Sequence, residues 1–292
     1  MTKVLVTGAG GMLGRDLLAV LDGRSDVTVT AATRSTLDLL DPEAVRDAVP
    51  GHDLVFNAAA WTDVDGAEAD EAAATAVNGT AVSSLAAACA ASGARLVHVS
   101  TDYVLPGDAS TPYPEDAPTA PVNAYGRSKL AGERAVQKLL PRDGYVVRTA
   151  WLYGAHGNNF ARTMLRLAAA RDTIDVVDDQ RGQPTWSHAL AARLVELGAR
   201  ALAGRAPAGV YHGTASGSTT WYGFARAVLA LNGLDAEKIR PTTSDRFVRP
   251  APRPAYSVLG HARWAAAGLP PMDGWHRMLV EAVAAGAVRP AS

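Results

Sequence analysis

Residues 4–14, with the sequence Val-Leu-Val-Thr-Gly-Ala-Gly-Gly-Met-Leu-Gly, decide the fold. A short apolar run ends at a glycine, and an amphipathic segment from Met12 to Leu21 follows, so we expect a strand, a tight turn and a helix. Glycines at 8, 11 and 14 let the backbone turn sharply and approach a phosphate without a Cβ in the way. The N–H groups at a helix N-terminus favour an anion there. The alternative is a strand-to-helix turn without a ligand, but its place after the first strand favours a nucleotide.

The rest of the first half repeats this alternation of strand and helix. Short runs of Val and Leu are separated by longer Ala-rich segments, as in a parallel sheet covered by helices on both faces. The expected strands are residues 27–31, 53–57, 96–99 and 145–148, and the expected helices are 42–49 (capped by Asp41), 67–92 and 124–139. The predicted class is therefore α/β, a Rossmann-like doubly wound parallel sheet.

After Trp151 the alternation loosens, and no linker separates two modules. We expect residues 1–150 to form an NAD(P)-binding domain and residues 151–292 to form mostly a smaller C-terminal substrate-binding lobe. Part of this half, about 172–206, is expected to return to the sheet. Further expected elements are helices at 159–170, 187–203 (with Ser187 as a candidate cap), 220–231 and 273–285, and strands at 174–177 and 209–212.

The composition excludes several classes of protein. The 28 basic and 29 acidic residues leave no positive excess for a nucleic-acid backbone. The single cysteine, Cys89, cannot form an intramolecular disulfide or a cysteine-based zinc site, which fits a reducing cytoplasm. No pair of histidines has metal-ligand spacing, so we predict no metal site. The uncharged stretch 72–94 is too polar for a membrane span and is predicted to be a buried helix.

Tyr125 and Lys129 are four residues apart and so share one face of the predicted helix. An ammonium near a phenol lowers the phenol's pKa, which makes the pair suited to protonating the alkoxide formed when a hydride reduces a ketone. Most isolated pairs of this kind are exposed helical neighbours. Ser100 and Thr101 end a predicted strand, where open α/β sheets bind ligands, although a simple strand-end turn explains them equally well. Together with the glycine turn, these residues favour a reductase.

The second predicted strand ends at residues 31–35 without the acidic residue that binds the ribose 2′-hydroxyl of NAD in such folds. Arg34 can instead pair with the 2′-phosphate of NADPH. The competing interpretation is a solvated surface arginine, which leaves NADH open as the cofactor. Asp38 and Leu39 either flank the adenine or form an exposed turn.

The motifs, taken in chain order, resemble the extended short-chain dehydrogenase/reductase superfamily. They are the glycine turn, Asn57-Ala58-Ala59-Ala60, the Ser/Thr pair and Y-x-x-x-K. Other segments resemble the dTDP-4-dehydrorhamnose reductase family more specifically. They are STDYV (100–104), YGRSKLAGE (125–133), RTAWLY (148–153), GNNFARTMLRLA (157–168), DQRGQPT (179–185) and ASGSTTWY (215–222).

This resemblance implies NAD(P)H-dependent reduction of the 4-keto group of dTDP-4-dehydro-β-L-rhamnose to dTDP-β-L-rhamnose. It implies that Tyr125 donates the proton, that Lys129 lowers its pKa and holds the nicotinamide ribose, and that Thr101 orients the carbonyl. The candidate substrate-binding residues are Thr101, Asp102, Tyr103, Trp151 and Arg253. The candidate cofactor-binding residues are Gly8, Gly10, Gly11, Met12, Leu13, Gly14, Arg34, Asp38, Leu39, Ala58, Ala59, Ala60, Trp61, Thr62, Tyr125 and Lys129.

The chain departs from the family pattern at two positions, and two alternative functions stay open. Some family members dimerise through Mg²⁺ held by glutamates, and here Asp16 and His188 stand at two of those positions. A Mg²⁺-linked dimer is therefore doubtful, while a homodimer without the metal stays open. The same catalytic residues would also serve a ketoreductase acting on another dTDP-4-keto-deoxysugar of secondary metabolism. A non-catalytic nucleotide-binding regulatory subunit is the other alternative, and the intact Thr101, Tyr125 and Lys129 argue against it.

Overall fold

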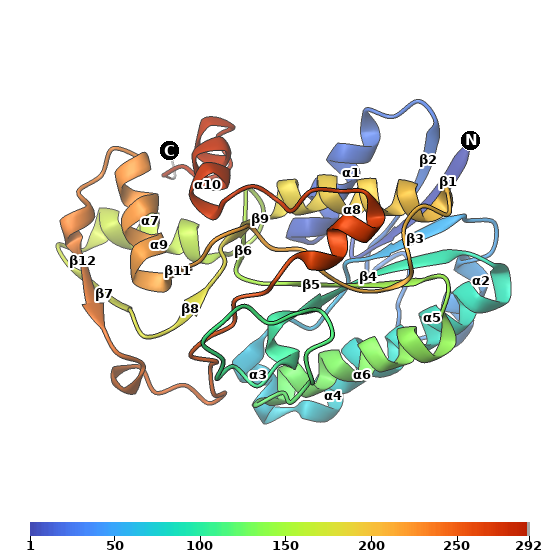
Figure 1. The fold of residues 1–292 in the computed structure, drawn as a ribbon, viewed down its shortest axis with the longest axis horizontal. Coiled ribbons are helices and arrows are strands. Elements are labelled where there is room, and N and C mark those ends of the chain that lie inside the picture. Colours follow the sequence, from blue (N-terminus) through green and yellow to red (C-terminus); the bar gives the residue numbers. More distant parts are fainter. Residues whose placement is uncertain (291–292) are drawn as a thin grey trace.

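The computed structural model describes residues 1–290 and shows a six-stranded parallel sheet with a lobe at one end (Figure 1). The strand order is β10-β5-β4-β3-β1-β2, and all neighbouring strands pair in parallel. The strands are β1 (Thr2–Thr7), β2 (Val27–Ala32), β3 (Leu54–Asn57), β4 (Arg95–Thr101), β5 (Gly144–Thr149) and β10 (Gly209–His212). The predicted Rossmann-like α/β class is confirmed.

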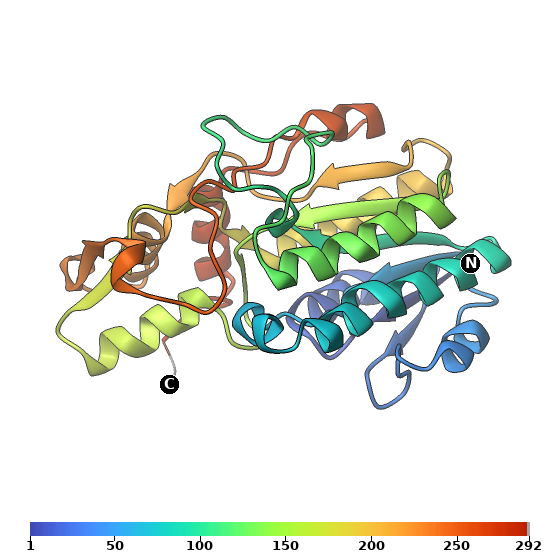
Figure 2. The same cartoon turned by 90° about the horizontal axis from the view of Figure 1, so that it is seen from below.

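Helices cover both faces of this sheet because successive strand residues point to opposite sides. In β1, Val4 and Val6 pack into one core cluster and Leu5 into the other. The helices α1 (Met12–Asp22) and α8 (Ser187–Leu202) pack together on the first face. The second face is covered by α2 (Pro42–Ala48), α5 (Ala81–Ser92) and α6 (Ala124–Leu139). Figure 1 shows the sheet between the two layers, and Figure 2 views it from the side of α5 and α6.

The long helix expected over residues 67–92 is interrupted in the structure. Asp70 leaves the helical conformation, with φ −144° and ψ 72°, and its side chain accepts a hydrogen bond from the Ala73 N–H. The resulting pieces are α3 (Val64–Ala69), α4 (Glu71–Thr75), a π-helical turn (Ala76–Thr80) and α5. The run from Glu71 to Ser92 is long and apolar enough to cross a membrane, but half of its most apolar window is buried inside the protein. This supports the predicted core helix.

The lobe has its own apolar core, built on Phe224, Ile239 and Leu279 among others. Its elements are α7 (Phe160–Ala170), β7 (Ile174–Val177), α9 (Trp221–Leu231), β12 (Ile239–Thr242) and α10 (Trp275–Ala284). The strand β7 pairs with β12 and does not join the main sheet. The parts of the second half that do return are α8, which packs on α1, and β10, which is an edge strand. The domain boundary at residue 150 stays a prediction.

The second half also contains two short strand pairs that are separate from the main sheet. They are β6 (Leu152–Tyr153) with β9 (Thr185–Trp186), and β8 (Arg181–Gly182) with β11 (Thr219–Thr220). Ser187 is not the cap of α8, because Trp186 occupies the cap position. The Ser187 hydroxyl instead donates to Asp16 at 2.5 Å and so ties α8 to α1. Within residues 1–290, no group of three or more His, Cys, Asp or Glu side chains is placed to hold a metal ion.

Candidate active site

The turn between β1 and α1 is built by close backbone contacts. Gly8 has φ +70°, and a Cβ on it would lie 2.5 Å from the Ala59 N atom. A Cβ on Gly14 would overlap the Gly8 carbonyl oxygen. Only glycine satisfies the left-handed backbone and the close approach together. The two residues therefore bring the loop after β3 and the start of α1 against the same turn.

A cleft of about 410 Å³ opens beside this turn, at the ends of β1, β2 and β3. The chain leaves β1 for β2 on one side and returns to β3 on the other, and open α/β sheets bind ligands at such a reversal. The cleft is lined by Thr7, Gly8, Gly10, Gly11, Thr33, Arg34, Leu37, Asp38, Leu39, Leu40, Ala58, Ala59, Ala60, Trp61 and Val77.

Most candidate cofactor-binding residues line this cleft, but several do not. Six of them are absent from its lining, and Leu13 is buried in the core beneath it; the six are Met12, Leu13, Gly14, Thr62, Tyr125 and Lys129. The candidate list did not include five lining residues, which are Thr7, Thr33, Leu37, Leu40 and Val77. Leu37 and Leu40 flank the predicted Asp38–Leu39 turn, so the argument that placed this turn beside the adenine could have included them. Val77 lies outside that argument, because a π-helical turn presents it.

The rim of the cleft near β2 carries a positive charge among hydroxyl groups. Arg34 is exposed there, and the Thr33 and Ser35 hydroxyls lie 2.9 Å apart. The Thr33 N–H donates to the Thr36 hydroxyl at 2.9 Å, which shapes the turn. Asp38 also lines the cleft, and its Oδ1 accepts the Leu40 N–H. A guanidinium surrounded by hydroxyl donors suits an anion such as a phosphate.

Tyr125 and Lys129 lie one turn apart at the start of α6. Asn123 caps this helix by accepting the Gly126 N–H at 2.8 Å. The Lys129 side chain is buried, and its Nζ donates to the Val99 carbonyl oxygen at 2.7 Å. Burial lowers the pKa of Lys129 to about 8, although the charge of Glu133 opposes this shift. The hydrogen bond from Lys129 to Val99 thus ties the start of α6 to the end of β4.

The segment Thr101–Tyr103 brings its side chains to the same place from the end of β4. The Thr101 hydroxyl donates to Asp102 Oδ1 at 3.0 Å and accepts the Tyr103 N–H at 3.2 Å. The Tyr103 ring meets the Tyr125 ring edge-on, with centroids 5.7 Å apart. The Asp102 carboxyl is 2% exposed, and burial raises its pKa to about 6 against the opposing hydroxyl groups around it.

The pKa of Tyr125 departs from the sequence-based expectation. Burial and the charge of Asp102 raise it, and the Thr101 hydroxyl opposes them. Lys129 was expected to lower this pKa, but it is not among the groups that shift it. The expectation is corrected because the Lys129 ammonium is turned to the Val99 carbonyl. The phenol of Tyr125 therefore stays protonated at neutral pH.

Trp151 lies where the sheet meets the lobe. It lies between β5 and β6 and has φ +48°, a left-handed conformation that is strained for a bulky residue. Its indole stacks on Trp221, the first residue of α9, with centroids 3.5 Å apart and planes 7° apart. Trp221 also donates from Nε1 to Gln180 at 3.2 Å. The stack holds the lobe against the end of the sheet.

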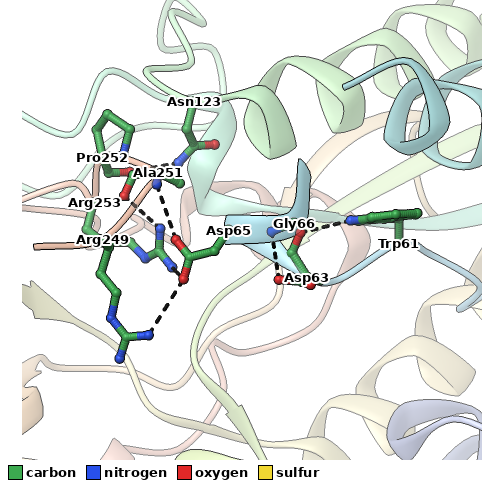
Figure 3. Close-up of polar contacts among 9 residues, drawn as sticks. All are labelled: Trp61, Asp63, Asp65, Gly66, Asn123, Arg249, Ala251, Pro252 and Arg253. Carbon is green, nitrogen blue, oxygen red and sulfur yellow. Dashed lines mark hydrogen bonds and ion pairs between the residues drawn. The ribbon is translucent and has the colours of Figure 1, made fainter. Parts of the chain in front are cut away.

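Arg253 lies in the chain segment that returns from the lobe, and Figure 3 shows its partners. Its Nη2 donates to Asp65 Oδ2 at 3.0 Å, and its Nη1 donates to the Ala251 carbonyl at 2.8 Å. Asp65 belongs to α3 and was missed by the sequence analysis, since nothing in its local pattern predicts a partner in residues 249–253. Asp102 and Arg253 lie close enough to Tyr103 that their charges shift the pKa of its phenol, so these three candidate substrate-binding residues are neighbours.

The glycine turn at the strand reversal, with a Thr-Tyr-Lys group at the neighbouring strand end, defines an extended short-chain dehydrogenase/reductase. Residues 1–288 match the family described as the RmlD substrate binding domain. The chain is 56% identical over 279 residues to a dTDP-4-dehydrorhamnose reductase of Streptomyces griseus, covering 95% of this chain and 91% of the relative. The chain belongs to the dTDP-4-dehydrorhamnose reductase family, as the resemblance predicted.

Two further comparisons bear on substrate and cofactor. A dTDP-4-keto-6-deoxy-D-glucose reductase of Streptomyces niveus is 51% identical, with 95% of each chain covered. The crystal structure of a dTDP-4-dehydrorhamnose reductase of Bacillus anthracis in complex with NADP has a TM-score of 0.90 at 32% identity, covering 98% of this chain and 100% of that one. The fold is therefore the same over nearly the whole length.

Proposed function

We propose that this chain uses NADPH to reduce the 4-keto group of dTDP-4-dehydro-β-L-rhamnose, giving dTDP-β-L-rhamnose. One observation carries the proposal: the Thr101 hydroxyl acts on the Tyr125 phenol, and Lys129 follows Tyr125 by one turn of α6 with its ammonium at the end of β4. Trp61 of the cleft and Tyr125 pack on the same small alanine cluster, which brings the two parts of the site together. The names of the relatives in S. griseus and B. anthracis support the substrate and the cofactor.

The residues of the cleft fit a dinucleotide phosphate. The bare backbone at Gly8, Gly10 and Gly11 and the N-terminus of α1 suit a pyrophosphate. Arg34 would hold a 2′-phosphate, which favours NADPH over NADH. NADPH, when bound, supplies the hydride. No magnesium is included in the proposal, because Asp16 is engaged by Ser187 and His188 lies 3.9 Å from it.

The chain itself would supply the proton and the orientation. As the hydride adds to C4, the C=O π bond breaks and the Tyr125 hydroxyl donates its proton to the sugar oxygen. The raised pKa of Tyr125, caused by burial and Asp102, keeps that proton available at neutral pH. The Thr101 hydroxyl, held by Asp102 and the Tyr103 N–H, would orient the carbonyl. Lys129 would hold the nicotinamide ribose.

The substrate would lie between the sheet and the lobe. Tyr103 meets Tyr125 edge-on and, with Asp102 and Trp151, would contact the sugar, while Arg253 would meet the diphosphate. A second substrate is favoured by the Streptomyces niveus relative, named as a reductase of dTDP-4-keto-6-deoxy-D-glucose. A non-catalytic regulatory role is disfavoured by the assembled catalytic group. We expect a cytoplasmic enzyme with a nucleotide-sugar substrate, and neither nucleic acid nor membrane as a partner.

Consumption of NADPH with a panel of dTDP-4-keto-hexoses tests the proposal. We expect the highest kcat/KM with dTDP-4-dehydro-β-L-rhamnose and formation of dTDP-β-L-rhamnose as the product. A higher value with dTDP-4-keto-6-deoxy-D-glucose would select the second substrate. No NADPH oxidation with any member of the panel would leave the regulatory role as the better interpretation.

A further inference from the structure

A segment rich in arginine and proline crosses the face of the molecule beside the candidate site. It comprises residues 247–254, which we call the strap, and it follows the last short helix of the lobe, Ser244–Arg246. Val248 is 91% exposed, so this part of the strap has little apolar packing. The strap is instead held by polar contacts with α3 and with the residue that caps α6 (Figure 3).

Asp65 of α3 provides the first attachment. Its Oδ1 accepts the Ala251 N–H at 3.2 Å, and its Oδ2 lies 3.0 Å from Arg253 Nη2 and 3.6 Å from Arg249 Nη1. The Asp65 side chain is about a quarter exposed, and the side chain of Arg253 about a fifth. One carboxylate therefore contacts a backbone amide and two guanidinium groups. Asp65 and Arg253 are 188 residues apart in the sequence.

Asn123 provides the second attachment. Its Nδ2 donates to the Pro252 carbonyl at 2.9 Å, while its Oδ1 accepts the Gly126 N–H at the start of α6. Tyr125 lies two residues further along this helix. The strap is thus tied to the same helix end that positions the proton donor.

The charge balance at the strap is positive. Asp65 supplies one negative charge against the two guanidinium groups of Arg249 and Arg253. Asp63, the other carboxylate of this turn, accepts the Gly66 N–H, and its side chain has no hydrogen bond or ion pair with the strap within residues 1–290. Arg253 uses its Nη1 and Nη2 for protein contacts, and a guanidinium has five N–H donors. Donors remain for an anion beside Tyr103.

We propose that Asp65 is a positioning residue that holds the strap against α3, so that the Arg253 guanidinium is already oriented to receive the diphosphate of the nucleotide sugar. The physical reason is preorganisation: an arginine on an unattached segment would lose its conformational freedom only on binding, which weakens affinity. This inference rests on the proposed function and adds to it a residue outside the known motifs.

The first experiment compares Asp65→Ala with Asp63→Ala. Both remove a carboxylate from the same turn, but Asp63 caps α3 and has no hydrogen bond or ion pair with the strap among the described residues. For Asp65→Ala we expect the KM of the dTDP-sugar to rise roughly tenfold, with kcat and the KM of NADPH within twofold of wild type. For Asp63→Ala all three values should stay near wild type. A KM of the dTDP-sugar that is unchanged in Asp65→Ala would overturn the proposal.

The second experiment needs no turnover. Calorimetry should show roughly tenfold weaker binding of dTDP to Asp65→Ala, with smaller loss for dTMP, which lacks the second phosphate. Hydrogen exchange at residues 247–254 should become faster, because the Ala251 N–H loses its acceptor. Equal losses for dTDP and dTMP would mean that Asp65 does not act on the diphosphate. If Asp65→Ala fails to fold, Asp65→Asn keeps an acceptor for Ala251 and removes only the charge.

These binding measurements separate the two proposals. If wild type reduces no keto sugar while Asp65→Ala still loses dTDP selectively, the proposed function fails and the role of Asp65 stands. If wild type is an active reductase and Asp65→Ala binds dTDP normally, the role of Asp65 fails alone.

Discussion

The cofactor cleft and the substrate face are assembled from very different spans of sequence. The cleft is lined by residues between Thr7 and Val77, mostly at three strand ends that follow one another along the chain. The substrate face joins Thr101 and Tyr125 to Trp151, which stacks on Trp221, and to Arg253, which pairs with Asp65. A local motif can specify the first region, whereas the second exists only when distant segments are packed together.

The two regions also differ in how their polar groups are satisfied. The cleft presents backbone at a glycine turn, with hydroxyls that bond to one another at its rim. Near the substrate face, the buried side-chain oxygens Ser100 Oγ, Asp102 Oδ2 and Thr149 Oγ1 have no partner among the described residues. An unpaired buried polar atom costs stability, so these oxygens lower the stability of the substrate face, whereas the hydroxyls at the rim of the cleft are paired.

The largest expected effect comes from Tyr125→Phe, which separates the two regions most sharply. Removing the phenolic proton should lower kcat by about 10²- to 10⁴-fold, the usual range for general acid catalysis. The affinity for NADPH, measured by fluorescence titration, should stay within threefold, because the cleft is intact. Near-normal turnover would show that another group donates the proton.

The second prediction concerns the buried carboxyl of Asp102 and its raised pKa. Its pKa of about 6 in the folded protein lies above the ordinary value of 3.8. The folded state therefore binds the proton more tightly, and its stability falls as pH rises from about 4 through 6. Because two pKa units correspond to about 3 kcal/mol, Asp102→Asn should gain up to that amount over wild type between pH 4 and pH 7.5. Urea unfolding at several pH values measures this gain, and a pH-independent difference would contradict it.

The third prediction tests the cleft. Arg34→Ala should weaken NADPH binding far more than NADH binding, because a charge-assisted contact to phosphate contributes about 1.5–3 kcal/mol. The ratio of the two affinities should fall roughly 10- to 100-fold. Arg46→Ala, an exposed arginine of α2 paired with Asp47, is the matched control and should leave the ratio unchanged. An unchanged ratio in Arg34→Ala would remove this residue from the cofactor site.

The smallest expected effect is at the lobe. Trp221→Ala removes the ring that supports Trp151, and a stacked aromatic pair contributes about 0.5–1.5 kcal/mol beyond its buried area. The KM of the dTDP-sugar should rise roughly three- to tenfold, and Trp221→Phe should restore part of it. Loss of the near-ultraviolet circular dichroism of the stacked pair checks the structural change directly. A shift in NADPH affinity instead would mean that the lobe and the cleft are coupled.

Local patterns predicted the bounds of an element well where a capping residue or the end of an apolar run marks them. The helix α6 begins and ends as expected at 124 and 139, since Asn123 caps it, and the strands β7 and β10 match the expected ranges. The break at Asp70 was missed because alanine continues on both sides of it. The pairing of β7 with β12 was missed because apolar periodicity does not say which strand is the neighbour.

The sequence by itself determined the glycine turn, the strand and helix alternation and the Thr-Tyr-Lys group. Each depends on backbone conformation, side-chain period or spacing within a few residues, which neighbouring residues specify. Only the tertiary structure decided that burial and Asp102 raise the pKa of Tyr125, that Trp221 supports Trp151, and that Asp65 holds Arg253. These outcomes depend on solvent exclusion and on contacts between residues far apart in the chain, and no local pattern encodes either.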